Sequence, residues 1–187
     1  RVLGVNFSVA AFLNIGYDHI SSVEHPTWED YFASKLRIFE QCTYGLVNLD
    51  SEHCEEILEA AKASKKVITF SETNEDADFY GYNVHKVGND IVFNVRGSDF
   101  DEEFKLSMPG LFNVSNALCA IAIARLYDIP VSDIQEGLYQ AKVPGRMEIY
   151  TSNDQKITAI VDYAHNRLSF QKLFESVRNE YPGYRVT

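Results

Sequence analysis

The sequence predicts an α/β fold, with a partial parallel sheet and its crossover helices, a small antiparallel β meander, and the start of a second α/β domain. In the first part of the chain, short apolar runs alternate with helical segments, which is typical of a parallel sheet. The middle part changes to runs that alternate polar and apolar residues, as half-buried antiparallel strands do. We assign residues 1–142 and 143–187 to different domains, and the turn-forming pair Pro144-Gly145 stands near the start of the second.

Strands and helices alternate in the first part. Residues 2–13 are apolar and rich in β-branched side chains, as expected of a buried parallel strand and its approach. Thr27 and Asp30 have the spacing of a capping box, so a helix should run from residue 28 to about residue 41. The elements that follow are predicted at 44–49 (strand), 52–64 (helix) and 66–70 (strand).

The rest of the chain is predicted to contain the meander, three helices and a hairpin. Glycine-containing turns separate the meander strands at 79–87, 90–96 and 103–106. An alanine-rich segment that is apolar almost all round predicts a core helix at 112–127. Further helices are placed at 131–140, with Ser132 as its cap, and at 168–180. Short strands at 147–151 and 157–161 flank a turn, and residues 184–187 resemble the start of another strand.

Composition excludes some classes of function. The chain has 17 Lys and Arg residues against 27 Asp and Glu residues and no basic stripe, which argues against a nucleic-acid-binding protein. Cys42, Cys54 and Cys119 lack a C-x-x-C spacing and are expected to be free thiols in a reducing compartment. We find no leader and no run near the ~18 apolar residues that a membrane span needs, so we expect no membrane and a cytoplasmic location. The chain begins at Arg1, without a methionine, so we expect a piece of a longer protein.

Two sets of residues in the first domain could carry chemistry. His19 follows the first strand, and Lys35 lies one helical turn after Tyr31. The alternative is a hydrogen-bonded histidine and a lysine on a solvated helix face. Asn113 and Asn116 share one face at the start of the apolar helix, where they could cap the helix or bind the edge of a purine.

A third set lies in the last part of the chain. Arg146 follows the Pro-Gly turn, and Asp162 and His165 follow the second hairpin strand. Reactive groups of α/β proteins collect at such strand ends. A guanidinium and a carboxylate together suit a phosphate and its metal ion. The alternative is a hairpin with a surface ion pair.

Taken in order, these motifs resemble the Mur ligases, the ATP-dependent amide-bond ligases of peptidoglycan precursor synthesis. N-I-G-Y-D-H with Y-F-A-S-K is similar to the N-x-x-x-D-H and A-K elements of that family, and L-F-N-V-S-N-A to its F-N-x-x-N-A helix. V-P-G-R-M-E and V-D-Y-A-H-N resemble its P-G-R-M-E and D-Y-A-H-[TN] elements. Within the family, the last two forms are most like the UDP-N-acetylmuramoyl-tripeptide synthetases, which add the third amino acid.

The resemblance implies a role for each candidate residue. His19 and a carbamylated Lys35 would bind Mg²⁺, because a carbamate converts the ammonium into an oxygen ligand. Asn113 and Asn116 would contact the adenine of ATP. Arg146 and Asp162 would contact ribose and phosphate, with His165 nearby. Arg1 would contact the UDP-N-acetylmuramoyl-dipeptide, to which an amino acid is joined through an acyl phosphate.

The sequence departs from the family pattern in several places. It contains no Gly-Lys-Thr phosphate loop, and Arg167 stands where the family has Pro. We therefore expect an isolated chain to be inactive and, because residues 5–13 are apolar on both faces, to self-associate through an open sheet edge. Two alternatives remain: a folylpolyglutamate synthase-type ligase, or a non-catalytic Mur-like domain that binds nucleotide or a partner.

Overall fold

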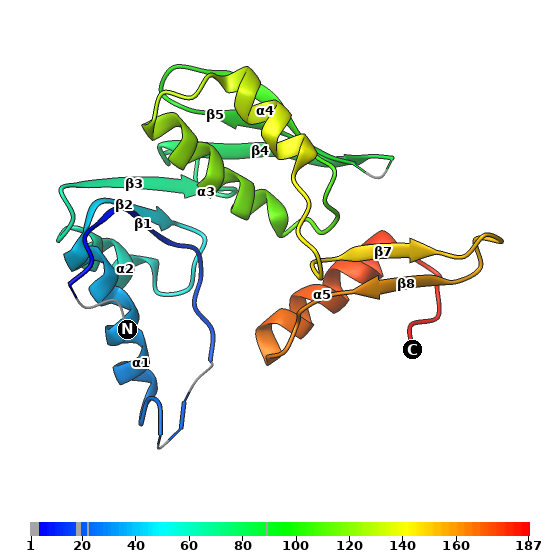
Figure 1. Cartoon of the computed structure of the whole chain (residues 1–187), viewed down its shortest axis with the longest axis horizontal. Helices are drawn as coiled ribbons and strands as arrows, with labels where there is room; N and C mark the ends of the chain where they lie inside the picture. The colour runs from blue at the N-terminus through cyan, green and yellow to red at the C-terminus, as the bar shows by residue number, and fades with distance from the viewer. Residues whose placement is uncertain (1–3, 18–19, 22, 89) are drawn as a thin grey trace.

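The computed structural model describes residues 4–17, 20–21, 23–88 and 90–187. Its main feature is a six-stranded sheet whose strands are neighbours in chain order (Figure 1). The α/β class predicted from the sequence is confirmed. The strands are β1 (Phe7–Phe12), β2 (Cys42–Asn48), β3 (Lys66–Ser71), β4 (Phe79–Val87), β5 (Asp90–Arg96) and β6 (Asp101–Leu106).

The first three strands are parallel, and the helices between them cover one face of the sheet. These helices are α1 (Trp28–Leu36), a 3₁₀ turn (Arg37–Gln41) and α2 (Cys54–Ala61). The helix predicted for residues 28–41 thus tightens to 3₁₀ geometry in its last part. The second predicted helix, 52–64, is shorter, because His53 before it has a left-handed backbone (φ 62°) and residues 62–64 bond to the carbonyls three residues earlier.

The antiparallel meander continues the parallel sheet, so the two together form one six-stranded sheet. β5 is antiparallel to both of its neighbours, β4 and β6, as predicted. β3 pairs with β4 in parallel over two residue pairs only, Phe70 with Phe79 and Ser71 with Tyr80. Because the two strands overlap only at the end of one and the start of the other, they pair without a crossover helix. The sequence pattern contained no signal for such a short overlap.

The other face of the sheet is covered by α3 (Asn113–Leu126) and α4 (Val131–Gln140). The apolar character of α3 is explained by its burial, and Leu118 is fully buried against Gly81 of β4. Ser132 does not cap α4, so that prediction was wrong. The N-cap is Pro130, and the Ser132 hydroxyl donates to the Asp133 carboxylate instead (3.3 Å).

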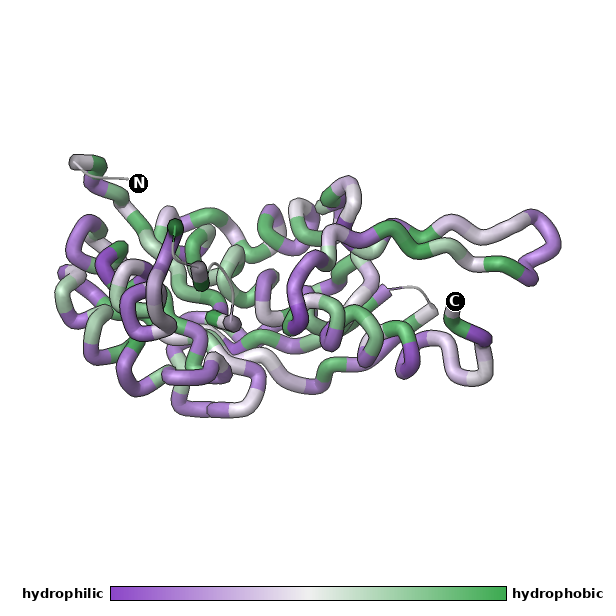
Figure 2. The backbone as a smooth tube through the Cα atoms, turned by 90° about the horizontal axis from the view of Figure 1, so that it is seen from below, coloured by the Kyte–Doolittle hydropathy of each residue, from purple (hydrophilic) through white to green (hydrophobic). Residues whose placement is uncertain are grey.

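The last part of the chain forms an antiparallel hairpin and a helix: β7 (Glu148–Thr151), β8 (Thr158–Val161) and α5 (Arg167–Glu180). The hairpin extends away from the main sheet (Figure 2). A capping box between Asn166 and Ser169 begins α5. Residues 184–187 form no strand, contrary to the prediction. The domain boundary at residue 143 lies between α4 and β7 and stays a prediction.

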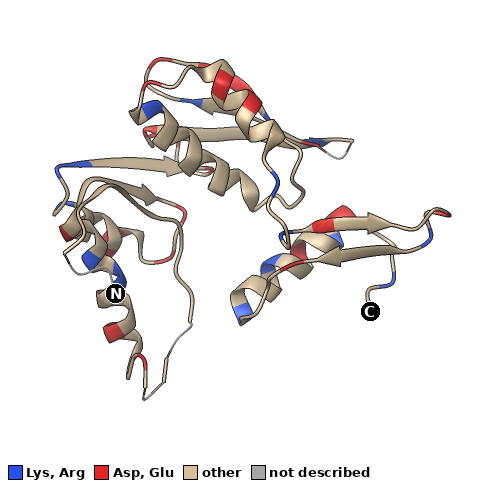
Figure 3. Ribbon diagram, viewed as in Figure 1, with Lys and Arg blue, Asp and Glu red and all other residues tan. Residues whose placement is uncertain are grey.

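Acidic residues are spread over both parts of the structure, with Lys and Arg scattered among them (Figure 3). Among the described residues, none of the helices is long and apolar enough to cross a membrane. β1 pairs with β2 and is one of the two edge strands of the described sheet, the other being β6. Self-association through the β1 edge stays a prediction.

Candidate functional site

The carboxyl ends of β1, β2 and β3 meet at one edge of the sheet, because the three strands are parallel. Asn48, the last residue of β2, is buried there. Its Nδ2 donates to the Leu13 carbonyl after β1 (2.9 Å) and to the Ser115 hydroxyl in the first turn of α3 (3.1 Å). Asn48 therefore joins the end of β1 to the start of α3. The end of β1 at Leu13 and the start of α3, where Asn113 and Asn116 lie, consequently belong to the same edge.

Lys35 lies at a cavity of about 350 Å³ at the carboxyl end of β1. The cavity is lined by residues 11–15 and by Tyr31, Lys35 and Ile38. The Lys35 side chain is exposed, and its Nζ lies 5.3 Å from the centroid of the Tyr31 ring, a cation–π contact. The helical spacing of Tyr31 and Lys35 predicted this neighbourhood. His19 and Arg1 lie outside the described residues, so their predicted roles stay predictions.

The chemistry of Lys35 fits a metal ligand only after modification. An ammonium has no lone pair for a cation, whereas a carbamate offers two oxygens. Among the residues that the structure describes, no group of three or more His, Cys, Asp or Glu side chains could hold a metal ion. A carbamate on the exposed Nζ of Lys35 would supply oxygen ligands at this cavity. Of the described residues at this cavity, Lys35 would therefore hold Mg²⁺ as a carbamate, without a preformed carboxylate cluster beside it.

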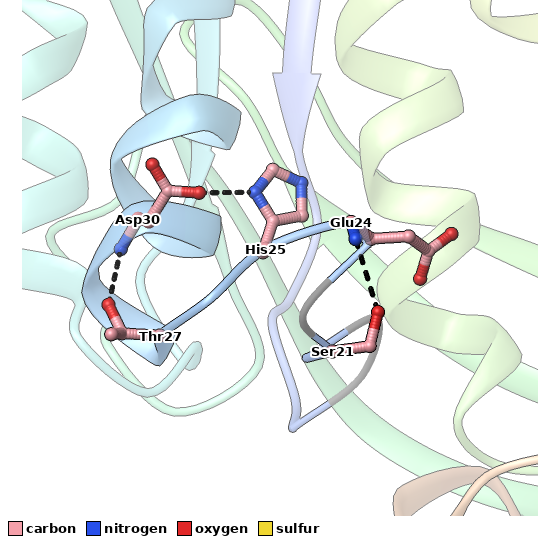
Figure 4. Close-up of polar contacts among 5 residues, drawn as sticks. All are labelled: Ser21, Glu24, His25, Thr27 and Asp30. Atoms are coloured by element: carbon pink, nitrogen blue, oxygen red, sulfur yellow. Dashed lines mark hydrogen bonds and ion pairs between the residues drawn. The ribbon is translucent and has the colours of Figure 1, made fainter.

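A histidine in the loop before α1 contacts a carboxylate in the first turn of that helix, and the sequence analysis did not single out this pair as a site (Figure 4). Asp30 was predicted to complete a capping box with Thr27, and half of that box is present: Thr27 Oγ1 accepts from the Asp30 backbone N–H (3.2 Å). The Asp30 carboxylate turns instead to His25 Nδ1 (2.7 Å). The His25 ring packs edge-on against Tyr31, with ring centroids 5.3 Å apart. This contact links the loop before α1 to the ring beneath Lys35.

Asn113 and Asn116 are brought together as predicted, and neither caps α3. Asn113 is buried, donates from Nδ2 to the Pro109 carbonyl (2.7 Å), and accepts from Asn116 Nδ2 (3.1 Å). Asn113 therefore fixes the loop before the helix and orients Asn116. Asn116 is exposed, and its amide has a second hydrogen and an oxygen besides the one bond to Asn113. Of the two, Asn116 has the geometry to reach a ligand.

Arg146, Asp162 and His165 also gather in one place. The Arg146 guanidinium lies over the Tyr163 ring, 5.0 Å from its centroid. The rings of Tyr163 and His165 are 4.9 Å apart at 57°. Tyr163 is thus the centre of this set, although the sequence analysis assigned it no role. Its place between Asp162 and His165 was the only signal that could have identified it.

The Asp162 carboxylate is held by the backbone. Oδ2 accepts from the Met147 N–H (3.0 Å), and Oδ1 accepts from the Ala164 N–H (2.8 Å). Each carboxylate oxygen can accept a further hydrogen bond, so Asp162 can fix the local fold and contact a ligand at the same time. His165 Nδ1 lies 2.9 Å from the Tyr163 carbonyl, and its backbone N–H donates to Ser169 Oγ (3.1 Å). His165 is thus tied to the first turn of α5, which begins two residues after it.

A polar network at the ends of β2 and β3 escaped the sequence analysis. Asp50 accepts hydrogen bonds from the Ser71 hydroxyl (2.5 Å), the Glu72 N–H (2.6 Å) and the Thr73 hydroxyl (2.5 Å). Burial, together with the charge of Asp50, raises the pKa of the Glu72 carboxyl to about 7, and Lys172 of α5 opposes this rise. Isolated polar residues in loops gave no pattern that could have predicted these contacts.

The last part of the chain contacts the sheet edge at its first loop. Leu168 of α5 packs so closely on Gly16 that a Cβ added to Gly16 would lie 2.8 Å from Leu168 Cδ2. Gly16 follows Ile15, which lines the cavity at Lys35. Among the described residues, no recorded contact joins the sets of Lys35, Asn116 and Arg146 directly to one another. They share the carboxyl edge through Asn48 and through the Gly16–Leu168 contact.

Comparison with known proteins places these residues in context. Residues 1–124 match the model of the Mur ligase middle domain. The chain is 35% identical, over 98% of its length, to a UDP-N-acetylmuramoyl-L-alanyl-D-glutamate–L-lysine ligase of Streptococcus mutans. It is 34% identical, over its whole length, to a UDP-N-acetylmuramoyl-L-alanyl-D-glutamate–2,6-diaminopimelate ligase of Clostridium botulinum. The chain spans 36% and 38%, respectively, of these two proteins.

A solved structure shares the fold. The crystal structure of MurF from Acinetobacter baumannii superposes on 91% of this chain with a TM-score of 0.79, at 24% sequence identity. The chain covers 37% of that structure.

Proposed function

The chain belongs to the Mur ligase family, and from that premise we propose that it forms part of the active site of an ATP-dependent ligase. The proposed reaction adds the third amino acid to UDP-N-acetylmuramoyl-dipeptide. ATP transfers its γ-phosphoryl group to the free carboxylate of the dipeptide, the amine of the amino acid attacks the acyl phosphate, and phosphate leaves. In this proposal, residues 1–142 are the later part of the ATP-binding central domain and residues 143–187 begin the C-terminal domain.

The observation that carries this proposal is the position of Lys35 at the cavity beyond β1. Of the lysines on the described helices, it is the one that lines this cavity, and its exposed Nζ is accessible to carbon dioxide and to a cation. We propose that Lys35 is carbamylated and that His19 is its fellow ligand. Bound Mg²⁺ supplies charge neutralisation for phosphoryl transfer.

Different residues of the chain would contact the adenine, the phosphates and the ribose of ATP. Asn116, oriented by Asn113, would offer its amide to the adenine edge. Arg146 would neutralise phosphate charge through its guanidinium, which lies over the Tyr163 ring in a cation–π contact. Asp162 would contact the ribose while its backbone bonds keep it in place. We propose that His165 orients Tyr163 and that Arg1 contacts the dipeptide substrate.

The proposal is tested by ligation in the complete enzyme that carries these residues. The complete enzyme should consume ATP only when UDP-N-acetylmuramoyl-dipeptide and an amino acid are both present. Lys35→Ala should abolish ligation, and high bicarbonate or a short carboxylic acid should partly restore it, because either supplies the missing oxygen ligand. Lys62→Ala is the matched control, since Lys62 is an exposed lysine at the C-terminus of the neighbouring helix α2 and pairs with Glu59 away from the cavity. Full ligation by the Lys35→Ala variant would contradict the assignment.

A further inference from the structure

One face of α5 is turned towards the main sheet. Four of its residues recur at intervals of four and therefore share that face: Leu168, Lys172, Ser176 and Glu180. Leu168 contacts Gly16 beyond β1, and the charge of Lys172 acts on Glu72 beyond β3. Ser176 is the buried residue of the helix. The helix thus crosses the ends of the strands from β1 towards β4.

The last contact of this face is an ion pair between Glu180 and Lys86 of β4. Lys86 Nζ lies 2.8 Å from Glu180 Oε2, although the two residues are 94 positions apart. The Glu180 side chain is only 2% exposed and that of Lys86 is 34% exposed. The Ser176 hydroxyl donates to the other oxygen, Oε1, at 2.7 Å. Both oxygens of this nearly buried carboxylate therefore have a hydrogen-bond partner. Loss of Lys86 would leave the buried Glu180 charge without its counterion, and loss of Glu180 would leave the Lys86 ammonium without its acceptor.

The position of α5 determines the position of Arg146, Asp162 and His165. Asn166, the N-cap of α5, directly follows His165. The capping box between Asn166 and Ser169 fixes the backbone where the chain enters the helix. Ser169 Oγ also accepts from the His165 N–H (3.1 Å). A rotation of α5 would therefore move this set relative to Lys35 and Asn116, to which it has no direct contact among the described residues.

We propose that Lys86 and Glu180 are positioning residues that hold α5, and with it the Arg146 set, against the carboxyl edge of the sheet. The role of the Arg146 set in binding ATP rests on the proposed function, whereas the docking of α5 against the sheet does not. The Gly16–Leu168 contact fixes one end of the helix and the Lys86–Glu180 pair fixes the other. Neither Lys86 nor Glu180 belongs to the motifs by which the sequence resembles its family.

Small-angle X-ray scattering and hydrogen exchange of the 187-residue chain test the docking. Glu180→Lys places two ammonium groups together, so the radius of gyration should increase and the amides near Lys86 and along α5 should lose protection. The exchanged pair Lys86→Glu with Glu180→Lys should recover most of both signals. Exchanging the exposed pair Glu59 and Lys62 at the end of α2 is the matched control and should change neither signal.

A second variant acts at the other end of α5 without changing charge. A Cβ at position 16 would already lie 2.8 Å from Leu168 Cδ2, and the valine side chain of Gly16→Val is larger still. This clash should push α5 away from the sheet, so the radius of gyration should also increase. The proposal would be overturned if the radius of gyration and the amide protection stayed unchanged in both Glu180→Lys and Gly16→Val. It would also be overturned if Lys86→Glu with Glu180→Lys recovered neither signal relative to Glu180→Lys alone. In the complete ligase, Glu180→Lys should raise the KM for ATP more than it lowers kcat. An inactive parent enzyme would refute the proposed function and leave the scattering result to decide the docking.

Discussion

The backbone N–H of Met147 donates to Asp162 Oδ2 at 3.0 Å and so joins the P-G-R-M-E segment to the D-Y-A-H segment. Met147 has a left-handed backbone (φ 49°), which is uncommon for a residue with a Cβ, and its side chain is 1% exposed. The Asp162 carboxylate also holds the Ala164 N–H. One side chain therefore fixes the turns on both sides of the hairpin, on which Arg146 and Tyr163 lie.

Asp162→Ala should loosen both turns. Each of the two amides would lose its acceptor, at a cost of about 1–3 kcal/mol for a group left unsatisfied. Hydrogen exchange followed by NMR should show faster exchange of the Met147 and Ala164 amides. Asp154→Ala is the matched control, because Asp154 accepts from Ser152 and Lys156 in the hairpin turn and not from these amides. Unchanged protection at Met147 in Asp162→Ala would show that the carboxylate does not hold the turn.

Thr27→Ala should destabilise α1, the helix that carries Lys35. Thr27 Oγ1 accepts from the Asp30 N–H, and loss of such an N-cap typically costs about 1 kcal/mol. Urea denaturation should give a lower midpoint with an unchanged slope. Ser132→Ala at the start of α4 should have almost no effect, because Ser132 makes no capping bond. Equal losses in the two variants would show that the bond to Asp30 has no special role.

Glu72 should make stability depend on pH. Its pKa is raised to about 7 in the folded protein, chiefly by burial and then by Asp50, from the usual 4.5. The folded state therefore binds this proton more tightly than the unfolded state, so the free energy of unfolding should fall as pH rises from about 4.5 to about 7. Because Glu72 is partly exposed, the loss should be on the order of 1–2 kcal/mol.

Glu72→Gln removes the titrating group and tests this dependence. Denaturation at a series of pH values should show a flatter profile between pH 4.5 and 7, and a variant more stable than the parent above pH 7. Profiles of equal slope for parent and variant would mean that Glu72 ionises at the same pH in the folded and unfolded chains.

The sequence predicted the helices and strands well, because the spacing of apolar residues and the turn-forming residues are properties of short segments. The strand–helix alternation predicted β1–β3, α1 and α2, and the apolar segment predicted α3. The parallel pairing of β3 with β4 was missed, because two pairs of residues leave no periodic pattern. Ser132 was misread because Pro130 already begins the helix, with its fixed φ.

The candidate site was predictable where a motif lies within one element and was not predictable where contacts cross elements. Tyr31 with Lys35, and Asn113 with Asn116, follow from helical spacing. Asn48 bonding to Ser115, and Lys86 pairing with Glu180, depend on how distant elements pack, which no local pattern encodes. The role of Tyr163 as the ring between Arg146 and His165 likewise became visible only in three dimensions.

Nucleotide binding by the chain tests the central claim most directly: that Asn116, Arg146 and Tyr163 belong to an ATP site whose phosphate loop is not in these residues. Without a Gly-Lys-Thr loop, several charge-assisted hydrogen bonds of roughly 1.5–3 kcal/mol each are lacking, so a micromolar affinity should weaken beyond millimolar. An NMR titration with ATP and Mg²⁺ should therefore give a dissociation constant above about 1 mM. The chemical-shift changes should centre on these three residues, and they should disappear in the double variant Asn116→Ala/Arg146→Ala. Micromolar binding, or shifts centred elsewhere on the chain, would contradict the account.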